Sequence, residues 1–271
     1  MRKSTIAVLA CVAAAIAYAG TAATTLRLKP KVGGVYRYVT TTTTTGGGQG
    51  GSQSSKQTSE QTVTVKNRVA AGYRIHTKIT DVKSSGNAAG TSDGEMKKML
   101  KGVSWEVDVT PTGKVSNMTT SATGQTKAIV NAMHSMDIGF MGVAYPPGPV
   151  KIGSTWTTTL DLSKMFTGLP GGNMLKITSG GKFPVRFKLT GVNAGKATLA
   201  VSMAGKTNMS MNSPQAGQQA QKMTMDMKST GTVKVNLANG LPTLADNVVH
   251  MDMKVMGMNM KQKILTSTKM R

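Results

Sequence analysis

The sequence predicts a mostly β protein that is built from two copies of one antiparallel meander. Residues 31–36 read K-V-G-G-V-Y and residues 151–156 read K-I-G-S-T-W, and each segment lies just after a proline and before a Thr-rich run. Turn glycines follow in the same order, because Gly72 corresponds to Gly195 and Gly113 corresponds to Gly240. A period near 120 residues is too long for a solenoid unit, so it indicates a duplicated domain.

The first copy spans residues 20–119 and is expected to begin with a strand at 34–44. A Gly/Ser/Gln loop is expected at 46–59 because of its composition. Two hairpins follow, and the segment 73–79 alternates apolar and polar residues with the period of two that a half-buried strand requires. Between the hairpins, residues 95–101 predict one or two helical turns.

The second copy spans residues 146–271 and repeats this order, with a strand at 155–162 and a Gly-rich loop at 168–181. A hairpin turns at residues 193–195. The next strand begins at Met223, and the Asn239-Gly240 dipeptide predicts the turn that follows it. Residues 251–260 are expected to return as one strand with a bulge beside Gly257, where the spacing of the methionines changes.

Residues 120–145 connect the two copies as a helix and a Pro-rich turn. Apolar residues at 129, 133, 136 and 140 follow helical spacing, so a helix of about four turns is expected over 126–140. Each meander has one apolar face that must be covered. The two copies can therefore form one curved sheet or half-barrel over the bridging helix, or they can stack as a sandwich. A half-barrel would leave an apolar cavity beneath the helix.

The N-terminus predicts a secretory signal peptide over residues 1–19. Arg2 and Lys3 precede an apolar stretch at 6–16, and residues 17–19 form an A-x-A cleavage site. No later segment approaches the ~20 apolar residues of a membrane-spanning helix. We therefore expect a secreted or periplasmic protein. Cys11 is the only cysteine, so a mature disulfide is excluded, and a lipid anchor at Cys11 is an alternative to cleavage.

The chain is strongly basic, with 33 Lys and Arg against 11 Asp and Glu and a net charge of +22. This balance favours contact with an anionic envelope surface, although exposed lysines can also serve solubility alone. The chain has no run of five basic residues, and aromatic residues make up only 4% of it. A specific nucleic-acid partner is therefore not expected, because single-strand binding relies on aromatic stacking.

Three segments give the chain a recognisable resemblance. They are Y-P-P-G-P-V-K-I-G-S-T-W at residues 145–156, D-V-T-P-T-G-K-V at 108–115, and the strand pair at 230–242 that ends in N-G-L-P. Together they resemble a family of uncharacterised secreted bacterial β-rich proteins. The architecture is similar to the lipoprotein carriers of the bacterial envelope, which fold as half-barrels with helices inside. That resemblance implies an acyl-binding cavity by analogy of fold.

Methionine is the most unusual residue in the chain, because 12 of its 21 copies lie between residues 203 and 270. They can simply fill the core, or they can line a deformable cavity for an acyl-type ligand. The candidate lining residues are Trp105, Met133, Met136, Phe140, Trp156, Met223, Met225, Met227, Met251 and Met253. A third reading is a Cu(I) site, because thioethers favour soft metals; its candidate ligands are His250, Met251, Met253, Met258 and Met260.

The sequence gives little support for catalysis. The three histidines are far apart, so they predict no zinc site. Glu106 and Asp108 share one strand face, where we expect them to be exposed and paired with lysines. The G-x-G-x-x-G match at 46–51 precedes a strand and not a helix, so it predicts a loop. We therefore expect a non-catalytic envelope protein that binds an apolar ligand without a cofactor; a Cu(I) protein and a purely structural surface protein are the alternatives.

Overall fold

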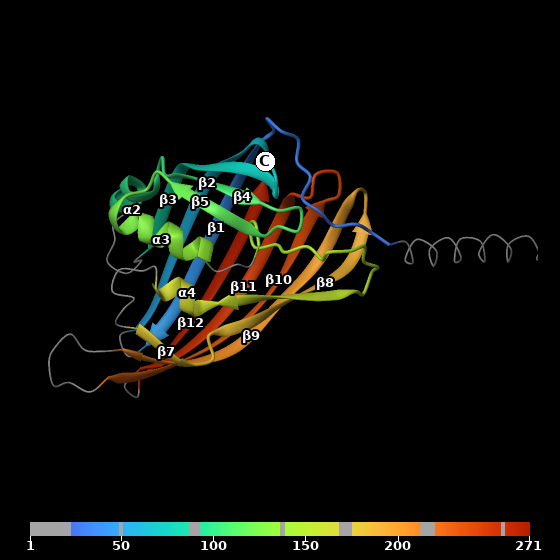
Figure 1. Ribbon diagram of the computed structural model, residues 1–271. Helices are drawn as coiled ribbons and strands as arrows, with labels where there is room; N and C mark the ends of the chain where they lie inside the picture. Colours follow the sequence, from blue (N-terminus) through green and yellow to red (C-terminus); the bar gives the residue numbers. More distant parts are fainter. Residues whose placement is uncertain are drawn as a thin grey trace, which may run out of the picture.

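A computed structural model describes residues 23–48, 51–86, 93–135, 139–167, 175–211, 220–255 and 258–271. Within these residues, twelve antiparallel strands form one sheet in the order β5-β4-β3-β2-β1-β12-β11-β10-β9-β8-β6, and β7 pairs with β9. The sheet is curved and does not close (Figure 1). The predicted mostly β fold with one curved sheet is therefore confirmed, and the sandwich is not formed. The expected signal peptide and Cys11 lie outside the described residues.

The strands have the following bounds: β1 Val35–Gly48, β2 Gly51–Val69, β3 Gly72–Gly86, β4 Ser104–Val109, β5 Val115–Thr120, β6 Thr155–Asp161, β7 Leu175–Ser179, β8 Lys182–Asn193, β9 Lys196–Met211, β10 Gln221–Asn236, β11 Pro242–Val255 and β12 Met258–Met270. The described helices are α2 (Asp93–Leu100), α3 (Gly124–Ser135) and α4 (Leu162–Thr167). They lie on one side of the long strands (Figure 1). None of these helices is long and apolar enough to cross a bilayer.

Chain order is preserved across the sheet. Each strand from β9 to β12 lies beside its predecessor, and β12 then pairs with β1, so the end of the second copy joins the start of the first. β7 is the exception, because it pairs with β9 while β8 lies beside β6. Thr40 lies opposite Thr268 in this central pair. The order is what two consecutive meanders produce when neighbouring strands pair without crossovers. The boundaries predicted for the two copies stay a prediction.

The two K-[VI]-G segments make matching backbone contacts. Gly33 N donates to Val65 O at 2.8 Å, and Val65 N donates to Gly34 O at 2.9 Å. In the second copy, Gly153 N donates to Leu189 O at 2.7 Å, and Leu189 N donates to Ser154 O at 3.0 Å. Both first glycines have positive φ, 77° and 93°, a conformation that glycine adopts without steric cost. The repeated motif therefore marks equivalent turns at the starts of β1 and β6.

Of the loop predicted at residues 46–59, residues 46–48 and 51–59 form strand, and residues 49–50 lie outside the described residues. The β1–β2 hairpin pairs without interruption from Val35 with Thr64 to Gly48 with Gly51. The Gly/Ser/Gln composition has low strand propensity, but this segment gains backbone hydrogen bonds from neighbouring strands. Tertiary pairing therefore overrides local composition here.

Residues 251–255 and 258–260 belong to two paired strands and not to one bulged strand. β11 ends at Val255 and β12 begins at Met258, and these two residues lie opposite each other. Gly257, where the bulge was expected, lies outside the described residues. The change in methionine spacing falls where the chain passes from β11 to β12, because the pairing places Met253 opposite Met260. The sequence therefore locates the irregularity correctly and assigns it the wrong structure.

The bridging helix ends earlier than predicted. α3 ends at Ser135, and the Phe140 N donates instead to Gly113 O in the β4–β5 turn at 2.7 Å. Phe140 also forms a β bridge with Val143. Gly139 and Gly142 have φ values of 93° and 76°, which are incompatible with a helix. α2 confirms the helical turns expected at residues 95–101, and α4 is a short helix that the sequence analysis did not predict.

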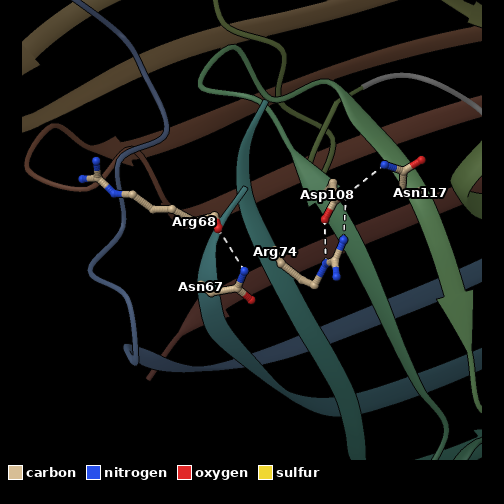
Figure 2. Close-up of polar contacts among 5 residues, drawn as sticks. All are labelled: Asn67, Arg68, Arg74, Asp108 and Asn117. Carbon is tan, nitrogen blue, oxygen red and sulfur yellow. Dashed lines mark hydrogen bonds and ion pairs between the residues drawn. The ribbon is translucent and has the colours of Figure 1, made fainter. Parts of the chain in front are cut away.

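Asp108 belongs to a polar contact that ties the edge strands together (Figure 2). Arg74 Nε donates to Asp108 Oδ1 at 2.8 Å, Arg74 Nη2 donates to Oδ2 at 3.1 Å, and Asn117 Nδ2 donates to Oδ2 at 2.9 Å. Asp108 is only 4% exposed. The expected exposed carboxylate with lysine partners is therefore wrong for Asp108, because an arginine on β3 and an asparagine on β5 enclose it.

The core consists of two clusters on the face of the sheet that residues 139–145 cover, here called the inner face. The end core lies where β1 begins, and it includes Leu26, Leu28, Tyr38, Val65, Phe140, Val143, Tyr145, Leu199 and Leu241. The methionine core lies further along β8–β10, and it consists of Leu160, Leu162, Phe183, Val185, Phe187, Met209, Met225 and Met227. The end core closes one end of the curved sheet, so any ligand site must lie beyond it.

Candidate functional site

A cavity of about 290 Å³ lies on the inner face, between the sheet and the segment at residues 139–145. This volume is at the lower end of the range for small-molecule sites, roughly 300–1,000 Å³. Strands β8–β12 supply most of its walls. The lining residues are Met141, Gly142, Leu160, Val185, Val201, Met203, Ser229, Gly231, Thr232, Val233, Ala245, Asp246, Asn247, Thr266 and Thr268.

Strand periodicity explains why these residues meet. Gly231 on β10 lies opposite Val201 on β9 and Asn247 on β11, and directly opposite residues share one face. A Cβ at Gly231 would lie 2.5 Å from Asp246 O and 3.0 Å from Asn247 Oδ1. The distance to the backbone oxygen is too short for a real Cβ contact, so only glycine fits here without a shift of β11.

The cavity has hydrogen-bonding groups as well as apolar walls. Ser229 is 7% exposed, and its Oγ donates to Asn247 Oδ1 at 2.7 Å. The hydroxyls of Thr268 and Thr40 are 3.0 Å apart and share a hydrogen bond. This mixture of apolar side chains and a few polar groups is typical of small-molecule sites.

Two buried tyrosines lie in the end core. Tyr145 Oη donates to Gly240 O. Tyr38 is 1% exposed, and its hydroxyl is the one buried side-chain polar atom among the described residues without a hydrogen-bond partner. Burial raises the pKa of both phenols, so both stay neutral near pH 7.

The predicted lining residues lie mainly beside the cavity and not around it. Met225 and Met227 are buried in the methionine core, and Met223, Met251 and Met253 pack against it. These five side chains form an apolar continuation of the inner face. The structure does not place them among the residues that line the cavity itself.

The predicted aromatic residues have packing roles. Trp156 Nε1 donates to Ala144 O at 2.7 Å, and its ring stacks on Phe187 with centroids 5.7 Å apart. Phe140 is buried in the end core, and Trp105 packs against that core. Met136 and the side chain of Met133 lie outside the described residues.

The structure divides the predicted Cu(I) ligands between two faces. His250 is exposed, whereas its neighbour Met251 packs against the methionine core, because successive residues of a strand point to opposite faces. His250 is therefore not brought together with the methionines. The register instead places Met225, Met253 and Met260 in one row across β10, β11 and β12, and Met258 is 42% exposed.

Sequence reasoning missed the polar part of the cavity. On the strands that hold this polar part, the sequence pattern singled out only methionines and His250. The polar residues that it did not single out are Ser229, Asn247, Thr266 and Thr268. The signal was the pair of Thr-rich segments at residues 40–45 and 266–268, which resemble ordinary solvent-facing strands. Only the pairing of β12 with β1 turns this pattern toward the inside of the sheet.

Comparison with protein-family models and with curated proteins finds no match. The resemblance to a family of secreted bacterial proteins therefore stays a prediction. Among solved structures, lipovitellin, in a structure describing its lipid–protein interactions, matches with a TM-score of 0.53 and 10% identity. The match covers 89% of this chain and 25% of the lipovitellin chain. At this identity the likeness concerns the fold alone.

A second solved structure is the attachment invasion locus protein Ail of Yersinia pestis in complex with the heparin analogue sucrose octasulfate. It is 6% identical and covers 89% of this chain and 100% of its own, but its TM-score of 0.22 carries no argument. The comparisons therefore define this chain as a curved β-sheet protein whose fold resembles part of lipovitellin.

Proposed function

We propose that this protein is a secreted, non-catalytic binding protein of the cell envelope, which holds an acyl-type ligand on the inner face of its sheet. The observation that carries this proposal is the cavity between the sheet and residues 139–145, with the methionine core continuing its apolar wall. Burial of apolar ligand surface supplies the affinity, at about 25 cal/mol per Å². Methionine side chains suit a flexible acyl chain because they are unbranched and adapt their shape.

The likeness to lipovitellin supports the same proposal at the level of fold. That protein is described by its lipid–protein interactions, and its chain contains a region with the fold of this protein. The analogy concerns the fold alone. It does not name the ligand.

Filling the cavity tests the proposal. Ala245 lines the cavity on β11, and Ala245→Phe places a ring inside it. Ala204→Phe is the matched control, because Ala204 is exposed on β9. Native mass spectrometry with palmitate or monopalmitoylglycerol should detect a lipid adduct for the wild type and the control, and none for Ala245→Phe. Absence of any adduct on the wild type would reject the carrier and leave the structural alternative.

Contact with an anionic envelope surface is part of the proposal. Lys228, His250 and Lys263 lie opposite one another across β10, β11 and β12, and the two lysines and the histidine are exposed on the outer face. Binding to vesicles that contain phosphatidylglycerol should weaken as salt is raised, because salt screens exposed charges. Binding that salt does not change would reject this part.

Cu(I) binding is the second candidate function. The row of Met225, Met253 and Met260 favours it, because directly opposite residues have Cβ atoms only about 4.5–5.5 Å apart. Long thioether side chains at this spacing can converge on one soft cation. Thermal unfolding with Cu(I) distinguishes the two candidates.

A further inference from the structure

The inner face is divided into two walls of different chemistry. Strands β6 and β8–β11 present mainly Leu, Val, Phe and Met, and they form the apolar wall. Strands β1, β2 and β12 form the polar wall, which presents hydroxyl and amide groups from residues that alternate along each strand. Thr42, for example, lies opposite Thr266 on one side and Gln57 on the other. The cavity touches both walls, because Val201 and Thr266 both line it.

No charged side chain points inward from these walls. In the described parts of β1 and β8–β12, no inner-face position holds Lys, Arg, Asp, Glu or His, although the opposite face of these strands is rich in lysine. Asp246 is among the residues around the cavity, but its neighbours Ala245 and Asn247 hold the inner-face positions, so the exposed Asp246 side chain lies on the outer face. A buried carboxylate or phosphate without a cation would lose its hydration and gain no ion pair. The inner face therefore disfavours a charged ligand group, despite the net charge of +22.

We infer that the ligand is an uncharged amphipathic lipid of the acylglycerol type. Its acyl chain packs on the apolar wall, and its hydroxyl and ester groups form hydrogen bonds with the polar wall. This inference rests on the proposed function and adds the ligand class to it. The apolar wall accounts for the chain, and the uncharged polar wall accounts for the head group. A free fatty acid matches the first wall only.

The experiment compares monopalmitoylglycerol with palmitate, because the two lipids share one chain and differ in charge. The inner variant is Thr40→Val with Thr268→Val, which removes both hydroxyls of one hydrogen bond. Its matched control is Thr41→Val with Thr58→Val, which removes the equivalent pair, 3.3 Å apart, from the outer face. Dissociation constants for both lipids are measured by tryptophan fluorescence at pH 8.

The wild type should bind monopalmitoylglycerol at least about tenfold more tightly than palmitate. The inner variant should lose about tenfold in affinity for the neutral lipid, the size of one good hydrogen bond, and keep its affinity for palmitate. The outer control should match the wild type. If the inner variant fails to fold, Thr268→Val gives the same comparison with one cavity-lining hydroxyl removed.

Equal or tighter binding of palmitate by the wild type would overturn the ligand class and leave the carrier in place. An equal loss in the inner and outer variants would overturn the assignment of the polar wall. Binding of neither lipid would reject the proposed function itself.

Discussion

Two buried tyrosines should respond to the same substitution with opposite signs. Tyr38 is 1% exposed and its hydroxyl has no partner, whereas the hydroxyl of Tyr145 donates to Gly240 O. Tyr38→Phe removes a buried donor that pays desolvation without forming a bond, so the free energy of unfolding should rise by about 1 kcal/mol. Tyr145→Phe breaks the hydrogen bond to Gly240 O and leaves this buried carbonyl without its donor. The free energy of unfolding of this variant should therefore fall by about 1–2 kcal/mol.

The two substitutions delete the same atom from the same end core, so their packing effects are similar and the hydrogen bond decides the difference. Urea unfolding of the ligand-free protein, followed by circular dichroism, measures both free energies. Melting temperatures should separate by several degrees, because 1 kcal/mol corresponds to about 2–4 °C at this size. Equal destabilisation by both variants would refute the reasoning, since it would mean that the hydroxyl of Tyr38 is satisfied in the folded protein.

Four further predictions follow from the same structure. Arg74 lowers the pKa of Asp108, so Asp108→Asn should cost about 1–3 kcal/mol at pH 7, and acid titration should erase the difference from about pH 4 downward as the carboxylate protonates. Above about pH 10 the free energy of unfolding should fall, because only the unfolded chain readily ionises the two buried phenols; a variant without them should show a smaller fall. Gly205→Ala should lower the melting temperature, because its Cβ would overlap the Phe183 ring. Under reducing conditions Cu(I) should raise the melting temperature of the wild type but not of Met253→Leu, and no shift in either would reject the second candidate function.

Much of the fold was predictable because alternation along a strand is a local property. The repeated K-[VI]-G turns and the turn at Gly240 marked where strands begin and end, and the structure contains the expected turns. The errors came where composition and pairing disagree. Residues 46–48 and 51–59 have a loop-like composition and form strand, because β1 and β2 pair from Val35 with Thr64 to Gly48 with Gly51.

The candidate site was less predictable than the fold. Methionine spacing identified one apolar wall, and Met225 and Met227 do lie in a buried cluster. The sequence analysis missed the polar wall, because a Thr-rich segment has the same appearance on a solvent-facing strand as on the inner face. Likewise His250 appeared beside Met251 in the sequence, while the strand places it on the other face.

The sequence by itself determined the β class, the duplicated turns, the basic charge and the alternation of residues along each strand, because these depend on neighbouring residues. Only the tertiary structure decided which strands pair across the two copies, and hence that Thr40 meets Thr268 beside the cavity. Register between strands more than 200 residues apart depends on the packing of the whole sheet, and no local pattern encodes it.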